Sequence, residues 1–105
     1  MNERHAAAAL AALGHEARLR VFRLLVKAGP GGLRVGEIGH LLAIPASTLK
    51  HHLGALVSAG LVEQERQGRE VVNRAAFDTV HEVLDYVHEE CCAGVIHPSE
   101  ADTAA

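Results

Sequence analysis

Hydrophobic residues recur at intervals of three and four through most of the chain, which is the spacing of helices that bury one face. Glycine or proline interrupts the pattern between most of these runs. Two runs of strand-like composition follow the fourth helical run and meet at Gln67-Gly68, which predicts a β-hairpin. The predicted helices cover residues 6–13, 15–28, 35–43, 47–59 and 77–92, and the predicted strands cover 61–66 and 69–75. The pattern therefore predicts a mainly α fold with a small β-hairpin.

The fourth predicted helix has an apolar stripe and an opposite face of small and polar residues. Pro45 disfavours a helical conformation at Ile44, so a new helix begins near Ser47 after a break from the third. The residues expected in the core are Leu49, Leu53, Leu56 and Val57. The opposite face holds Ser47, Thr48, His51, Gly54, Ala55 and Ser58, with Lys50 and His52 on its flanks. Two helices joined in this way predict a helix-turn-helix, and with the hairpin the unit resembles a winged helix.

Short polar side chains at the start of an exposed helix let its backbone approach base edges in the major groove of DNA. An ordinary solvated helix face has the same appearance. The hairpin favours the DNA-binding interpretation, because Arg66 and Arg69 flank its turn and can contact phosphate. Glu63, Glu65 and Glu70 oppose part of that charge.

Charge is divided unevenly along the chain, although the net charge is −3. Residues 15–74 contain nine Lys/Arg and five Asp/Glu, whereas residues 75–105 contain seven Asp/Glu and no Lys/Arg. This division suits DNA contact by the middle of the chain. At 105 residues we expect one domain over 1–94, with a small core that dimerisation would enlarge, and a mobile acidic tail over 95–105. Without an apolar run of ~20 residues or a signal peptide, we expect a cytoplasmic protein with no membrane partner.

In the last predicted helix, apolar residues recur at intervals of three and four, which is the spacing of two helices that pack along a common seam. Its apolar stripe consists of Phe77, Val80, Leu84, Val87 and Cys91. The first helix is rich in alanine and presents Leu10 and Leu13, so close helix contact is expected there too. These two helices are predicted to form the interface of a homodimer.

The runs AALGHEARLRVFRLL and VGEIGHLLAIPASTLKHHLGALVSAGLVEQERQGREVVNR resemble the ArsR/SmtB family of metal- and metalloid-responsive repressors, over roughly residues 7–92. The resemblance implies a dimeric winged-helix repressor that a ligand releases from its operator in double-stranded DNA, for which we expect an inverted repeat. By matching position, it implies base contacts for Ser47, Thr48 and His51, a phosphate contact for Lys50, and wing contacts for Arg66 and Arg69. The cysteine motif that many arsenic sensors of the family carry in the DNA-binding unit is absent. The end, HEECCAG, is instead similar to the subgroup with an adjacent cysteine pair after the last helix, without the third cysteine of some members.

Cys91 and Cys92 are the predicted ligand site, with no obligatory cofactor. Thiolates are the preferred ligands of soft trivalent arsenic and antimony. Adjacent side chains on a helix diverge by about 100°, so chelation would require the last turn to unwind, which Ala93-Gly94 permits. Two thiolates complete the coordination of a methylated trivalent arsenical, whereas inorganic arsenite needs a third ligand. The simpler interpretation makes Cys91 a small hydrophobe in the helix seam.

A zinc or nickel site is an alternative, because His81, Asp85, His88 and Cys92 follow one another at spacings of four, three and four. The usual ligand spacing of the zinc sensors in the similar family does not match. A thiol-redox-responsive regulator is a further alternative. Thiol-redox catalysis is disfavoured because Glu89 and Glu90 would raise the pKa of the thiols, and no strand–helix redox scaffold or catalytic triad is evident. We therefore expect no enzyme.

Overall fold

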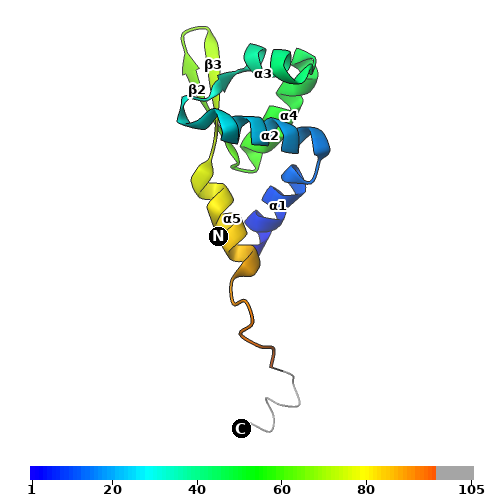
Figure 1. Cartoon of the computed structure of the whole chain (residues 1–105), viewed down its shortest axis with the longest axis vertical. Helices are drawn as coiled ribbons and strands as arrows, with labels where there is room; N and C mark the ends of the chain where they lie inside the picture. The colour runs from blue at the N-terminus through cyan, green and yellow to red at the C-terminus, as the bar shows by residue number, and fades with distance from the viewer. Residues whose placement is uncertain (97–105) are drawn as a thin grey trace.

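The computed structural model describes residues 1–96, which form five α-helices and a three-stranded antiparallel sheet (Figure 1). In chain order the elements are α1 (Glu3–Leu13), α2 (Glu16–Ala28), the 3-10 turn η1 (Gly29–Gly31), β1 (Leu33–Arg34), α3 (Val35–Leu42), α4 (Ala46–Ser58), β2 (Val62–Gln67), β3 (Glu70–Ala75) and α5 (Phe77–His88). The predicted mainly α winged helix-turn-helix is confirmed. Residues 97–105, most of the predicted tail, lie outside the described part of the chain.

The molecule has two parts along its length (Figure 1). The helices α2, α3 and α4 form one part together with the sheet, and α1 and α5 converge to form the other. The core that joins them is made of buried aliphatic side chains from all five helices and the hairpin, among them Ala9, Val21, Leu25, Ile38, Leu49, Leu53, Leu56, Val62 and Val83. Among residues 1–96, no helix is long and apolar enough to cross a membrane.

The turn between α3 and α4 is tight. Ala43 has a φ of 55°, and the Ile44 backbone N–H donates to the Gly39 carbonyl over 3.1 Å. A Cβ at position 39 would lie 3.1 Å from the Ile44 carbonyl oxygen, so glycine allows the chain to fold back closely. Pro45 then precedes α4, as the sequence predicts.

The hairpin pairs β2 with β3 from Val62 opposite Ala75 to Gln67 opposite Glu70. A third strand, β1, was not predicted. It pairs with β3 by placing Leu33 opposite Asn73, so β3 is the central strand of the sheet. Gly32 makes this possible: its φ is 67°, and a Cβ there would lie 2.5 Å from the Asn73 carbonyl oxygen.

Several predicted side-chain positions are wrong. Val57, expected in the core, is 36% exposed, and His52, expected on a flank, is buried with 7% of its surface exposed. α2 packs against α4 and covers that flank. The last helix ends at His88 and not near Cys92, and its buried residue is Val83, which the predicted seam omits.

Candidate nucleic-acid interface and thiol site

The start of α4 presents a polar surface to solvent. Leu49, Leu53 and Leu56 are almost completely buried and hold one side of the helix in the core. Ser47, Thr48 and His51 are therefore exposed together on the other side, with Lys50 also exposed beside them. The predicted orientation of α4 is confirmed for these residues, while their contacts with DNA stay predictions.

A groove of about 430 Å³ runs between the start of α3, α4 and the hairpin. Three cationic side chains line it: Arg34 from β1, Lys50 from α4 and Arg69 from the turn of the hairpin. The structure thus brings two predicted DNA-contacting residues, Lys50 and Arg69, to one groove. Glu37 and Glu70 also line the groove and pair with Arg34. Lys50 and Arg69 therefore leave it with a net positive charge that suits a phosphate backbone.

The carboxylates of the hairpin are largely occupied by other arginines. Arg74 Nη1 lies 2.8 Å from Glu65 Oε2, and Arg34 Nε forms an ion pair with Glu70. Hydrogen bonds from Gln67 and Arg74 lower the pKa of Glu65. No carboxylate pairs with Arg66 or Arg69 among residues 1–96. Glu65 and Glu70 are therefore directed at other partners, although Glu63 is not, and Arg66 and Arg69 have no carboxylate within ion-pair distance in this part of the chain.

Arg34 is a residue of this surface that the sequence analysis missed. Its backbone N–H donates to Glu37 Oε1 over 3.0 Å, and its guanidinium pairs with Glu37 and with Glu70 of the hairpin. It thereby joins the first turn of α3 to the wing. The sequence does contain a signal for this role, because Glu37 follows Arg34, the residue before α3, by three positions. This spacing is typical of helix N-termini.

A histidine cluster lies behind the polar face of α4, against the start of α2. The rings of His15 and His52 are 4.9 Å apart between centroids, and those of His51 and His52 are 5.9 Å apart. Arg18 Nε donates to His52 Nδ1 over a long 3.4 Å. Burial, followed by the charges of His15, Arg18 and His51, lowers the pKa of His52. No local pattern in the sequence indicates this cluster, since its members come from two elements.

Cys91 and Cys92 lie in a turn beyond α5, and both are exposed. Their Sγ atoms are 3.4 Å apart. The Cys91 backbone N–H donates to the His88 carbonyl, and Cys92 has a φ of 63°. The pair is thus already off the helix, so the unwinding expected for chelation is not needed. Cys91 does not continue the apolar seam, because the helix ends before it.

The alternative metal stripe is not assembled within one chain. His88 Nε2 lies 3.8 Å from Asp85 Oδ1, and both side chains are mostly exposed, as is His81. In the described residues 1–96, no three or more His, Cys, Asp or Glu side chains are grouped so that they could hold a metal ion.

Comparison with known proteins agrees with this arrangement. A family model described as a helix-turn-helix domain matches residues 13–65, about half of the chain. The biofilm growth-associated repressor of Agrobacterium fabrum is 32% identical over 84 residues, which cover 80% of this chain and 69% of that protein. An ArsR-like transcriptional regulator from Rhodococcus sp. RHA1 has a TM-score of 0.73 at 27% identity, covering 86% of this chain and 81% of that one. A homodimeric winged helix-turn-helix DNA-binding domain from Mycobacterium bovis has a TM-score of 0.68 at 28% identity, covering 90% and 88%.

Proposed function

The chain belongs to the helix-turn-helix family and is a winged-helix transcriptional regulator of the ArsR/SmtB type, and from this we propose that it is a dimeric repressor released from its operator by a thiol-binding ligand. The related proteins are regulators and not enzymes, which confirms the expectation that this chain is not an enzyme.

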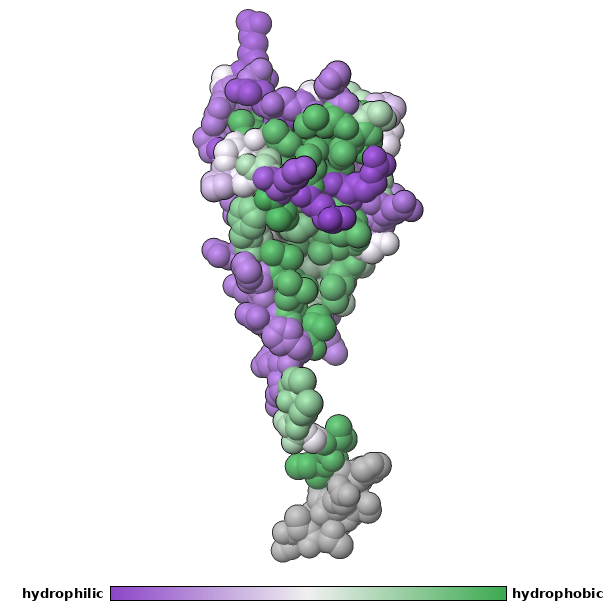
Figure 2. All heavy atoms as spheres, in the orientation of Figure 1, coloured by the Kyte–Doolittle hydropathy of each residue, from purple (hydrophilic) through white to green (hydrophobic). Residues whose placement is uncertain are grey.

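The surface of α1 and α5 supports the dimer. Leu84 and Val87 of α5 are 52% and 59% exposed, and Leu10 of α1 is exposed as well. Figure 2 shows apolar residues gathered over these two helices. An open apolar depression lies beside them, lined by Leu13, Leu19, Phe22, Leu24, Val26 and Val80 with two cations. A second copy of the chain would bury this surface, and the similar domain from Mycobacterium bovis is homodimeric.

In such a dimer the two copies of α4 would enter successive major grooves of an inverted repeat. Ser47, Thr48 and His51 would contact base edges, and Lys50 would contact phosphate. Arg66 and Arg69 of the wing would extend the phosphate contacts, because they have no carboxylate partner within the described chain. The operator is therefore expected to have half-sites about one helical turn, or a multiple of it, apart.

The separation of 3.4 Å between the two sulfurs carries the ligand proposal. With bonds of about 2.3 Å, as in zinc–thiolate sites, two sulfurs on one central atom are roughly 3.3–3.8 Å apart. Cys91 and Cys92 are thus placed to bind one soft atom, such as trivalent arsenic or antimony, without rearrangement of α5. A methylated trivalent arsenical needs only these two ligands, whereas arsenite also needs a hydroxide, a small thiol or a group from the partner.

A redox-responsive regulator is the second candidate, because two exposed thiols in contact can also react with an oxidant. A bond between adjacent cysteines is strained, which disfavours a stable intramolecular disulfide. Zinc or nickel binding by His81, Asp85, His88 and Cys92 would have to use ligands from both copies, since the described residues of one chain do not assemble the set.

The test is operator release measured by gel shift with the reduced full chain. Arsenite and a monomethylated trivalent arsenical should each release the wild-type protein, whereas Cys91→Ser and Cys92→Ser should bind operator normally and fail to respond, because one thiolate remains. His88→Ala serves as the matched control and should respond like wild type. Release of both serine variants by arsenicals would place the sensor elsewhere. Release by zinc that His88→Ala abolishes would favour the metal stripe, and release by peroxide alone would favour the redox candidate.

A further inference from the structure

His52 is a feature of α4 that the proposed DNA contacts do not use. It is the one titratable side chain that is buried among residues 1–96, with 7% of its surface exposed. It lies on the same helix as the exposed residues Ser47, Thr48 and His51, but its ring faces His15 and Arg18 of α2. A buried ionisable group at this position is costly to charge.

We propose that His52 is a positioning residue for α4, and that a proton on its imidazole loosens the contact between α2 and α4 and so weakens operator binding. This inference rests on the proposed function, because it requires that α4 is the helix that enters the major groove of DNA.

The hydrogen bonds of the cluster require neutral imidazoles. Arg18 Nε donates to His52 Nδ1, and the Ala17 backbone N–H donates to His15 Nδ1 over 3.2 Å as the cap of α2. A neutral imidazole has one acceptor nitrogen, and an imidazolium has none. Protonation of His52 would therefore place an N–H group against the N–H of Arg18, and protonation of His15 would remove the cap at the start of α2.

The charges around His52 have one sign. His15 and Arg18 of α2 and His51 of α4 are the titratable or charged groups that act on it, and no carboxylate is among them. A proton on His52 thus adds a buried positive charge beside the guanidinium of Arg18, with nothing to compensate it. Burial and these neighbours hold the pKa of His52 below its ordinary value of 6.5.

Because the pKa of His52 is lowered in the folded chain, the direction of the pH effect can be worked out. When the folded pKa of a histidine lies below its unfolded value, the unfolded chain binds more protons as pH falls. The stabilising contribution of His52 is therefore complete above pH 6.5 and is lost as pH falls through its folded pKa.

A looser contact at His52 would displace the exposed face of α4 that is proposed to contact DNA. Leu53 follows it in sequence and Leu49 and Leu56 lie one turn away on either side, so the ring is part of the packed side of α4. Any shift of that side against α2 moves the exposed side of the same rigid helix. A small displacement suffices, since base contacts require hydrogen-bond distances.

The experiment measures operator affinity from pH 8.0 to 5.5 at constant ionic strength. Wild-type affinity should fall about three- to tenfold over this range. His52→Gln should show no such fall, because the amide oxygen can accept from Arg18 and does not titrate. His40→Gln removes an exposed histidine of α3 and should keep the wild-type profile. Parallel pH profiles for wild type and His52→Gln, which differ only at this residue, would overturn the proposal.

A second measurement uses the wild-type protein alone, so it does not depend on whether the variant folds. Nitrogen NMR of the wild-type protein without DNA should find His52 protonated at Nε2 and free at Nδ1 at pH 7.5, and should titrate it below 6.5. A His52 pKa at or above 6.5 contradicts the proposal. Failure of wild type to bind any operator at pH 7.5 contradicts the proposed function instead, so the two failures are distinguishable.

Discussion

At the scale of single residues, Asn73 shows how one polar side chain ties the wing to the rest of the domain. It is completely buried in the central strand β3. Gln64 Nε2 of β2 donates to its Oδ1 over 2.8 Å, and its Nδ2 donates to the Leu33 carbonyl of β1 over 3.2 Å. One side chain therefore links all three strands, and both halves of its amide are satisfied.

Asn73→Ala should lower the free energy of unfolding by about 2–3 kcal/mol, because it deletes both hydrogen bonds and leaves a small cavity. Urea denaturation measures the loss. The matched control is Gln64→Ala, which should cost under ~1 kcal/mol because Gln64 is exposed and its position can be hydrated. Equal losses for the two variants would mean that the bond to Leu33 contributes nothing.

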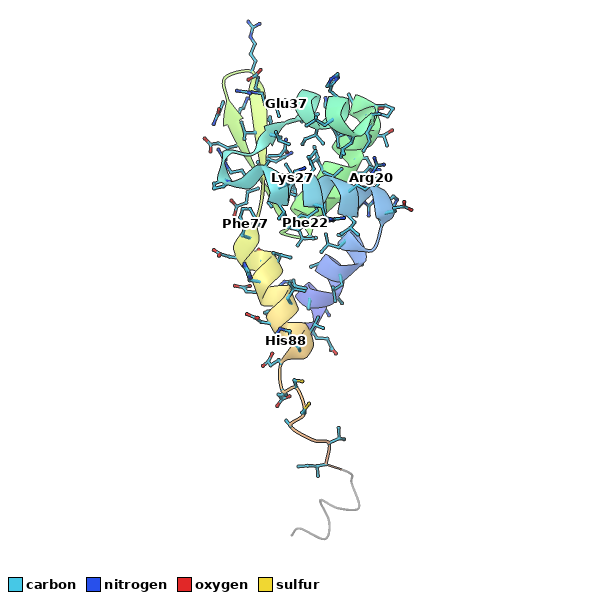
Figure 3. The ribbon with its side chains drawn as sticks, in the orientation of Figure 1. Arg20, Phe22, Lys27, Glu37, Phe77 and His88 are labelled. Atoms are coloured by element: carbon cyan, nitrogen blue, oxygen red, sulfur yellow. The ribbon has the colours of Figure 1, made fainter. Side chains whose placement is uncertain are left out.

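At the scale of elements, the wing depends on how its charges are paired. Arg74 is paired with Glu65 along the hairpin, and Arg34 links Glu70 to the first turn of α3. The latter ion pair joins the hairpin to the helix-turn-helix, because Arg34 also pairs with Glu37 of α3, which Figure 3 labels. Arg34 thus holds the hairpin against the first turn of α3, and neither Arg66 nor Arg69 has an ion-pair partner among residues 1–96.

Arg69→Ala should weaken binding to all DNA sequences about equally and should reduce the slope of log affinity against log salt by about 1, because one phosphate contact is lost. Titrations at several salt concentrations measure both quantities. Arg20→Ala is the control: Arg20 lies on α2 away from the hairpin (Figure 3) and its removal should leave the slope unchanged. A loss of discrimination between operator and random DNA in Arg69→Ala would instead indicate base contact by the wing.

At the scale of the whole molecule, α1 and α5 leave an apolar surface that one chain does not cover. Leu84 lies at the centre of the exposed stripe of α5 and is half exposed. The first helix contacts α2, α4 and α5 and buries its alanines Ala6, Ala9 and Ala12, whereas Leu10 stays exposed. Both helices therefore have one side in the core and another free for a second copy.

Leu84→Glu should convert the dimer to a monomer and reduce operator affinity at least about tenfold, because two linked recognition helices bind far more tightly than one. Sedimentation analysis measures the assembly, and gel shift measures the affinity. Glu82→Gln is the control, since Glu82 is exposed on the same helix outside the stripe and should remain dimeric. A dimeric Leu84→Glu protein would place the interface on another surface.

Local signals in the sequence were sufficient for the helices and the hairpin. The period of Leu49, Leu53 and Leu56 identifies the buried side of α4, and Pro45 and Gly60 mark its ends. The orientation of Ser47, Thr48 and His51 follows from the same period, so the exposed part of the candidate interface could be predicted. These properties depend on neighbours a few residues apart, which the sequence displays directly.

The tertiary structure decided the features that depend on distant neighbours. Leu33 pairs with Asn73 across 40 residues, and a strand of two residues has no periodicity of its own. His52 is buried because α2 covers its side of α4, and Arg34 lines the groove between α3, α4 and the hairpin, where it pairs with Glu70. Burial and pairing of this kind arise from contacts between elements, and no local pattern encodes them.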